Sequence, residues 1–334
     1  MDPLTQGALG AALPQTIAKK PFVGRAGLFG FLAGMAADLD VFFRSPEDPL
    51  LFLEYHRQFT HSLVFVPIGG MLCGILLYAL IGGRWNLSLL QSSLFCTLGY
   101  ATHSILDSCT SYGTQLFWPF SDERVAWDAI SIIDPLFTVP VLLGIFVAGR
   151  NKKPFYARVA LVWAIFYISL GVLQREGAVL LGKELAAERG HKLLRIDAKP
   201  SFANIFLWKT VYETQERFYV DAVRPSFSPR VFIGTSIEKL NVSRDFNWLL
   251  PNSRQAQDIE RFRLFSNGYV AQDPSHPNRV IDVRYSMVPN EIAALWSIEL
   301  SKKAASNTHV KFITNRERTI ERFQKVWSMI VEHH

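Results

Sequence analysis

Long stretches without charged side chains constrain the fold of this chain more than any other feature of its sequence. Four stretches hold at most one Asp, Glu, Lys or Arg each: residues 62–83, 85–106, 129–149 and 154–174. An apolar run of about 20 residues is long enough to cross a lipid bilayer as a helix. We therefore predict a membrane span in each of these ranges.

Two further apolar stretches precede them. Residues 22–43 form a weaker candidate span because they end in two aspartates, and residues 4–17 are short enough to be either a tilted span or a re-entrant helix. After residue 174 the sequence alternates charged and apolar side chains, as a soluble domain does. We expect a membrane α-helical bundle of five to six apolar segments in residues 1–174, followed by a small soluble α+β domain in residues 175–334.

Basic residues in the short loops predict the orientation. One set of loops carries seven of them: Lys19, Lys20, Arg25, Arg84, Arg150, Lys152 and Lys153. The opposite loops carry only Arg44, Arg57 and Arg124, together with several acids. Because basic residues are enriched in cytoplasmic loops, we expect a multi-pass protein of a bacterial inner membrane, with its C-terminal domain in the periplasm.

Charge and cysteine content exclude other classes. The net charge of +6 is not arranged as a basic stripe with interleaved aromatic residues, so we expect no nucleic-acid partner. Cys73, Cys96 and Cys109 lie within or beside apolar segments and form neither a disulfide framework nor a paired-thiolate metal motif. The sequence gives no indication of the oligomeric state.

Ionisable residues of the metal-ligand type gather at the ends of the apolar segments, all on the predicted outer side. They are Asp2, Asp38, Asp40, His56, His61, His103, Asp107, Asp128 and Asp134. Ionisable groups at membrane depth are costly, so a cluster on one face indicates a functional site.

The histidines carry most of this argument. His103 and Asp107 are four residues apart and share one helix face, where they either ligate one metal or pair with each other. His56 and His61 flank the entry to the next span, with Thr60 as a candidate N-cap. We predict that both histidines are metal ligands.

The acids are more ambiguous. Asp38 and Asp40 can converge on one ion only if the helix ends there. Asp134 and Asp2 each precede a proline and are either ligands or helix N-caps. We treat Asp128 as a candidate catalytic acid, although it can equally be a loop residue.

A mixed set of imidazoles and carboxylates suits Zn²⁺ best, with Mn²⁺ as an alternative. The candidates outnumber the ligands of one tetrahedral site, which predicts two ions, an arrangement suited to phosphoester hydrolysis. Arg57 is then a candidate to hold a phosphate oxygen, unless it only reaches lipid headgroups.

Several strings in consistent order resemble one known family. They are MDPLTQGALGAAL at 1–13, the Asp38–Asp40 pair, HRQFTHS at 56–62, HSILD at 103–107 and SIIDPLF at 131–137. Over about residues 1–150 the chain resembles the bacterial LexA-regulated, inner-membrane, metal-dependent hydrolases. The resemblance implies a hydrolytic metal site similar to those of zinc phospholipase C. It also implies His56, His61, His103 and Asp107 as ligands, supported by Asp38, Asp40 and Asp134.

One position departs from that family. Its members commonly have Thr-His near the N-terminus, where this chain has Thr5-Gln6. Glutamine is a poor Zn²⁺ ligand, so either one metal position is altered or Asp2 takes its place.

The sequence of the C-terminal half indicates a fold but contains no candidate catalytic or metal-binding motif. Ile281, Val283 and Tyr285 alternate with polar residues, which indicates a half-buried strand. Extended segments are also predicted at 204–213, 217–223, 230–237 and 308–313. Ile320, Phe323, Trp327 and Ile330 form the apolar stripe of a helix.

Three functions fit the sequence. The first is a metal-dependent hydrolase that acts on a phosphoester in a membrane lipid or lipid-linked molecule at the outer face. The second is a binding or regulatory protein with a structural metal. The third, a transporter, requires acids at mid-depth and on both faces, whereas the acids gather at one face.

Overall fold

The computed structural model describes residues 1–226, 228–315 and 319–331. These residues form two compact units. The first contains Met1–Phe43, Tyr55–Val172 and Phe202–Asn204, and the second contains Arg44–Glu54, Leu173–Ser201 and Ile205–His334. A membrane helical region followed by a soluble α+β domain is therefore confirmed.

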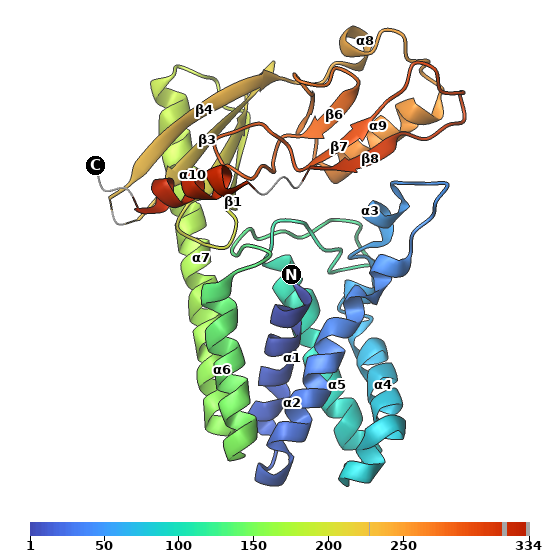
Figure 1. Cartoon of the computed structure of the whole chain (residues 1–334), viewed down its shortest axis with the longest axis vertical. Helices are drawn as coiled ribbons and strands as arrows, with labels where there is room; N and C mark the ends of the chain where they lie inside the picture. The colour runs from blue at the N-terminus through green and yellow to red at the C-terminus, as the bar shows by residue number, and fades with distance from the viewer. Residues whose placement is uncertain (227, 316–318, 332–334) are drawn as a thin grey trace. The chain divides into compact units, whose positions relative to one another are not determined.

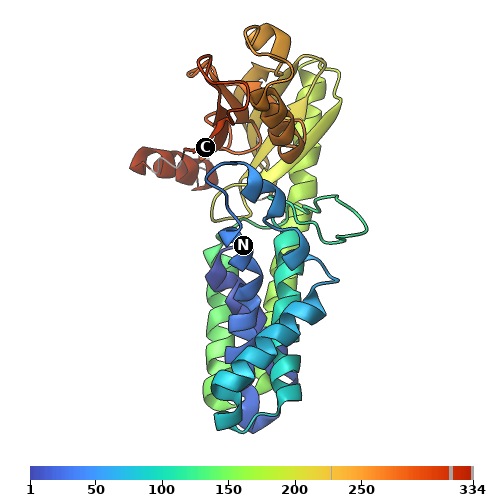
Figure 2. The ribbon, with the colours of Figure 1, turned by 90° about the vertical axis from the view of Figure 1, so that its right-hand side faces the viewer.

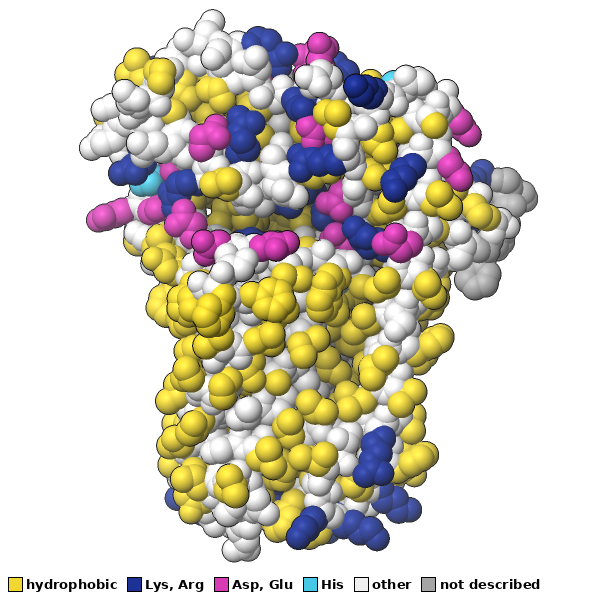
Figure 3. Space-filling model, turned by 180° about the vertical axis from the view of Figure 1, so that it is seen from behind, with side chains coloured by type: hydrophobic (Ala, Val, Ile, Leu, Met, Phe, Trp, Pro, Cys, Tyr) yellow, Lys and Arg dark blue, Asp and Glu magenta, His cyan; other side chains and the backbone are white. Residues whose placement is uncertain are grey.

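The first unit is built of helices that run along a common direction (Figures 1 and 2). They are α1 (Pro3–Ile17), α2 (Val23–Ala36), α4 (Val66–Leu77), α5 (Leu89–Ser108), α6 (Pro135–Asn151) and the first part of α7 (Pro154–Glu188). Three described helical stretches are long and apolar enough to cross a membrane: Lys20–Phe42, Val66–Trp85 and Pro154–Glu188. Helix α6 is apolar but shorter. Figure 3 shows apolar side chains over this unit and Lys and Arg side chains at its lower end.

Helix α1 is the short apolar segment of the sequence. It is buried along most of its length, from Thr5 to Ala12 and again at Pro14 and Gln15. Its neighbours therefore shield it from lipid, and it tolerates polar side chains that would be costly on a lipid-exposed span.

Glycines allow the helices around α1 to approach closely. A Cβ atom on Gly99 of α5 would lie 2.3 Å from the carbonyl oxygen of Gly30 on α2. A Cβ on Gly10 of α1 would lie 2.6 Å from the same oxygen. Gly70 and Gly74 of α4 have equally close neighbours on α5. Gly30 with Gly34 and Gly70 with Gly74 each form a G-x-x-x-G pair at a helix contact, as small residues in membrane helices commonly do.

The second unit contains two antiparallel four-stranded sheets. The first sheet is β1 (Arg195–Pro200), β2 (Trp208–Glu213), β3 (Arg217–Arg224) and β4 (Arg230–Glu238), in that order. The second is β5 (Val270–Gln272), β6 (Arg279–Asp282), β7 (Trp296–Glu299) and β8 (Lys311–Thr314). Helices α8 (Val242–Asp245), α9 (Arg254–Phe265) and α10 (Ile320–Val331) accompany them. The helical stripe predicted from Ile320 is confirmed.

The strand predicted around Val283 ends earlier than expected. The backbone N–H of Arg284 donates to Asp282 Oδ1 at 3.0 Å, an aspartate turn that closes β6 at Asp282. Val283 is nevertheless fully buried. The alternation of apolar residues around Val283 therefore predicted its burial correctly, but it did not predict where the strand ends.

A short segment from the N-terminal half also belongs to the second unit. Arg44–Glu54 contributes Leu50 and Leu53 to an apolar cluster with residues such as Phe246 and Ile259. Its acids pair with Arg261 of α9, which donates to both oxygens of Asp48 at 3.0 and 2.8 Å and to Glu54 at 2.6 Å. The sequence did not predict this association.

Candidate metal centre

Four of the predicted ligands lie together at one end of the helical unit. Asp38 follows α2, His61 ends the short helix Phe59–His61, and His103 and Asp107 lie in the last turns of α5. One ligand atom from each lies within 4.8 Å of all the others. A second group shares Asp38 and adds Asp40 and His56.

The two buried imidazoles point the same type of atom at each other. His103 Nε2 and His61 Nε2 are 2.9 Å apart. His103 Nδ1 lies 2.6 Å from the carbonyl oxygen of Gly34, which can only accept, so Nδ1 carries the proton. His61 Nδ1 lies 2.9 Å from Thr60 Oγ1, whose own hydrogen goes to Asp40 Oδ2 at 2.9 Å. With both Nδ1 atoms protonated, the two Nε2 lone pairs point at each other. They repel each other unless a proton or a metal cation lies between them.

Asp107 adds an oxygen to the same point. Its Oδ1 accepts from Gln6 Nε2 at 2.8 Å and contacts the α-amino group of Met1. Its buried Oδ2 accepts no hydrogen bond from the described residues, although Arg57 Nε is 3.0 Å away and His61 Nε2 3.3 Å away. Arg57 forms an ion pair with this oxygen, which still has room to accept a further contact from a metal ion.

The end of α2 brings both aspartates to the site. The α-helix stops at Ala36 and continues as the tighter 3-10 turn Ala37–Phe42. Asp38 Oδ1 lies 3.4 Å from His61 Nε2, while Asp40 Oδ2 lies 3.2 Å from Nδ1 of the same ring. Asp38 therefore lies on the Nε2 side of the His61 ring and Asp40 on its Nδ1 side, where it orients the imidazole in the carboxylate–histidine arrangement common at metal sites. Asp38 is 19% exposed, whereas Asp107 and both rings are fully buried.

The second group is closer to solvent. His56 Nδ1 lies 2.7 Å from Asp40 Oδ1, and its side chain is 18% exposed. Burial lowers the pKa of His56 below its ordinary value despite the neighbouring carboxylate. Its imidazole is therefore neutral at neutral pH, the form that binds metals.

The field of the site favours positive charge. Burial disfavours a charged imidazole, but the nearby carboxylates of Asp107, Asp38 and Asp40 outweigh it and raise the pKa of His61 to about 10, so His61 holds a second proton, on Nε2, at neutral pH. The same carboxylates would stabilise a bound cation at this position.

Arg57 is held beside the ligands in a strained backbone conformation. Its φ of 64° lies in the left-handed region, which is uncommon for a residue with a side chain and often marks a functional site. Its Nη1 donates to Thr110 Oγ1 at 3.0 Å, and its guanidinium carbon lies 4.8 Å from the centre of the Tyr112 ring. The ring of Tyr112 also packs edge-on against His56, with centroids 5.7 Å apart.

Three predicted site residues are not brought into either ligand group. Asp134 caps α6, accepting from the backbone of Leu136 and Phe137 at 3.1 and 3.3 Å and from the Tyr167 hydroxyl at 2.9 Å. Asp2 caps α1 and accepts from the backbone of Thr5 at 3.0 Å. Asp128 is buried, with a φ of 52°, and belongs to neither group.

Sequence reasoning also missed several contributors. Thr60 was expected to cap a helix, but its hydroxyl instead links Asp40 to His61. The carbonyl of Gly34, Thr110 and Tyr112 gave no local signal, because their roles depend on which helices and loops lie side by side. The proximity of Gln6 to Asp107 was signalled only by its departure from the family pattern.

The comparisons identify the family of the chain. The model described as YdjM inner membrane protein matches residues 1–178, so the chain belongs to this family. The matched region includes every residue of both ligand groups.

Two relatives show how far the similarity extends. Inner membrane protein YbcI of Escherichia coli (strain K12) is 32% identical over 123 residues, which cover 35% of this chain and 65% of YbcI. The match therefore spans slightly less than two thirds of that relative. A protein of Bacillus subtilis (strain 168) named as uncharacterized protein YfhP is 24% identical over 282 residues, covering 82% of each chain. No solved structure matches the chain.

Proposed function

We propose that this protein is a membrane-embedded, metal-dependent hydrolase that cleaves a phosphoester in a lipid or lipid-linked substrate at the outer face of the inner membrane. The observation that carries the proposal is the pair of Nε2 atoms that face each other beside a buried carboxylate oxygen, Asp107 Oδ2. A helical membrane protein has little reason to bury such a set unless an ion completes it.

The donor set fits a borderline divalent ion, with Zn²⁺ favoured over Mn²⁺. Asp38, His61, His103 and Asp107 would hold one ion, and the group of Asp38, Asp40 and His56 offers a place for a second. When bound, such ions supply Lewis-acid activation of water and neutralise charge on a phosphoryl group.

The protein's own residues then divide the remaining work. Asp40 and Thr60 orient His61, and the carbonyl of Gly34 orients His103. Arg57 would bind a phosphate oxygen through the part of its guanidinium that Asp107 and Thr110 do not use. We propose that the substrate enters past Asp38 and His56, the two ligands that are partly exposed.

Metal analysis and turnover test this proposal together. Purified full-length protein should retain a stoichiometric divalent ion and hydrolyse bis(p-nitrophenyl) phosphate, a generic phosphodiester. The His103→Ala variant should lose both. Protein that folds, is loaded with Zn²⁺ and shows no turnover of phosphodiesters or phospholipid would contradict the hydrolase.

That last outcome would favour a structural metal in a regulatory protein. One observation supports this second candidate: three of the four ligands in the first group are fully buried. A closed site of this kind restricts substrate access, as structural metal sites do.

A further inference from the structure

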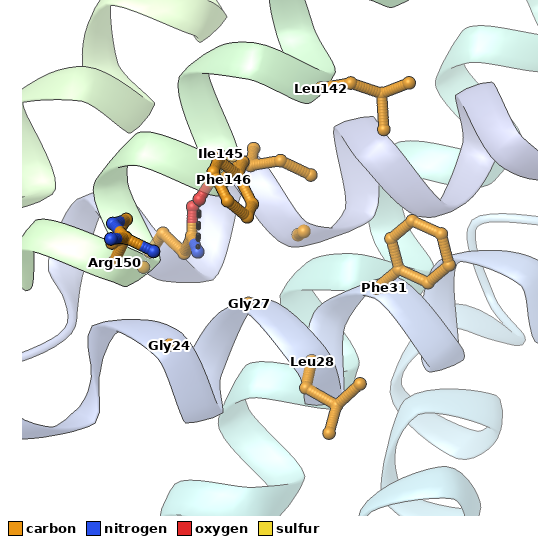
Figure 4. A pocket seen from close by; sticks show the side chains of 11 residues that line it. Gly24, Gly27, Leu28, Phe31, Leu142, Ile145, Phe146 and Arg150 are labelled. Atoms are coloured by element: carbon orange, nitrogen blue, oxygen red, sulfur yellow. Dashed lines mark hydrogen bonds between the residues drawn. The ribbon is translucent and has the colours of Figure 1, made fainter.

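The helical unit also contains a groove of about 600 Å³ between α1, α2 and α6. Figure 4 shows Arg150 at one end of the groove and Phe31 and Leu142 toward the other. Its volume is in the range of small-molecule sites. Gln15 of this groove and Gln6 of the metal site are nine residues apart on α1, which corresponds to about 13 Å of helix.

Missing side chains create the groove. Gly24 and Gly27 of α2 and Gly149 of α6 all line it. A Cβ atom on Gly24 would lie 3.6 Å from the carbonyl oxygen of Gly149, an ordinary contact, so the position can be filled without a clash. Gly27 is different, because its Cβ would lie 2.3 Å from Gln15 Nε2.

The walls are apolar and face outward. Phe146 is 64% exposed and Leu28 is 38% exposed, and both belong to apolar helices of the membrane region. Contact between such an apolar surface and water is unfavourable, whereas contact with an acyl chain is favourable.

Two polar groups interrupt this apolar lining. Gln15 is only 3% exposed; its Nε2 donates to the carbonyl oxygen of Ile145 at 3.2 Å, but its Oε1 has no hydrogen-bond partner among the described residues. A buried amide oxygen left unpaired costs about 1–3 kcal/mol. A hydrogen-bond donor such as a hydroxyl group would remove this cost by pairing with Gln15 Oε1.

Arg150 supplies the complementary charge. It lies in the last turn of α6, and its guanidinium has no ion pair with any residue that the structure describes. Lys152 and Lys153 follow after one intervening residue, so this end of the groove is strongly basic. A basic site at the end of a membrane helix attracts the phosphate of an anionic lipid.

We propose that this groove binds an anionic phospholipid of the phosphatidylglycerol class. Its acyl chain would lie along Phe31 and Phe146, its phosphate would pair with Arg150, and a headgroup hydroxyl would donate to Gln15 Oε1. The proposal is independent of the hydrolase, because none of these residues belongs to the metal groups.

Native mass spectrometry of the full-length protein in detergent tests it, with phosphatidylglycerol and phosphatidylethanolamine of identical acyl chains as probes. Phosphatidylglycerol should bind more tightly. Arg150→Gln should weaken its binding about tenfold, the effect of losing one charge-assisted contact. Gln15→Met should weaken it severalfold, and Gly24→Leu should block the groove.

Lys153→Gln is the matched control, since it removes the same charge at the same end but outside the groove; its binding should stay within about twofold of the original. Equal affinity for the two lipids would overturn the proposal. Equal losses in Arg150→Gln and Lys153→Gln would also overturn it, because they would show attraction to a basic surface without a groove.

Discussion

His61 and His103 face each other through their Nε2 atoms at 2.9 Å, although 42 positions separate them in the chain. The opposite ring nitrogen, Nδ1, is positioned in each case by a neighbour. Asp40 and Thr60 contact Nδ1 of His61, and the carbonyl oxygen of Gly34 contacts Nδ1 of His103. The protein thus fixes the orientation of both rings, as the neighbours of metal-binding histidines commonly do.

Replacing one of these rings should remove the metal. We expect His103→Ala to lower Zn²⁺ affinity by more than about tenfold, since even groups that only orient a ligand affect affinity on that scale. Metal analysis after dialysis at fixed free Zn²⁺ measures this. His276→Ala is the control, because the His276 side chain is exposed and, among the described residues, hydrogen-bonds only to Asp273. Equal metal content in both variants would count against the site.

Gln6 offers a gain-of-function test. Its Nε2 lies 2.8 Å from Asp107 Oδ1 and its Oε1 has no hydrogen-bond partner among the described residues. Gln6→His places an imidazole beside the ligands and restores the residue common in the resembled family. We expect tighter or additional metal binding, measured as stoichiometry by metal analysis. Gln6→Met, which adds no ligand for Zn²⁺, should not raise it.

Asp134 should matter for stability and not for metal content. Its carboxylate caps α6 and accepts from Tyr167 at 2.9 Å. Asp134→Ala should cost about 1–2 kcal/mol, the usual effect of losing a helix cap. Thermal unfolding of the detergent-solubilised chain measures the loss. A drop in bound metal with unchanged stability would instead make Asp134 a ligand.

Arg261 should support the metal centre from outside it. The segment Arg44–Glu54 lies in the chain between two site residues, Asp40 and His56, and Arg261 holds it through Asp48 and Glu54. Arg261→Gln should expose this segment to proteases and weaken metal retention, because its ends are then less constrained.

Arg263→Gln serves as the comparison, since the Arg263 side chain pairs with Glu260 on its own helix and with no other residue that the structure describes. Limited proteolysis and metal analysis of both variants measure the difference. Increased cleavage with unchanged metal content would show that the segment does not position the ligands.

Lys209 should make the stability of the second unit depend on pH. Burial lowers the pKa of Lys209 from 10.5 to about 7, although Asp282 and Glu291 oppose the shift. Between those values the unfolded chain binds a proton that the folded chain does not, so stability should rise from pH 7 toward pH 10.

Lys209→Met should remove this dependence and stabilise the unit at pH 7, because the cost of burying an ammonium group disappears. Proteolysis in urea at pH 7 and 9, with cleavage sites in residues 205–299 mapped by mass spectrometry, measures both effects. An identical pH dependence in the two proteins would refute the assignment to Lys209.

The sequence by itself determined where the apolar helices lie and at which end the ligand-type residues gather, although α5 is not among the described helices long and apolar enough to cross a membrane and α6 is shorter. These are local properties, because the length of an apolar run and the position of a charge within it depend only on neighbouring residues. The extended segments predicted at 204–213, 217–223 and 230–237 likewise overlap strands β2, β3 and β4, although a turn at Asp282 shortened β6.

Only the tertiary structure decided which of those residues meet. Asp134 and His103 are both polar residues at the end of an apolar helix, yet one caps its helix and the other faces His61. The difference arises from packing: the glycine contacts between α2 and α5 bring the carbonyl of Gly34 to His103. Distances between segments far apart in the chain follow from such contacts, and no local pattern encodes them.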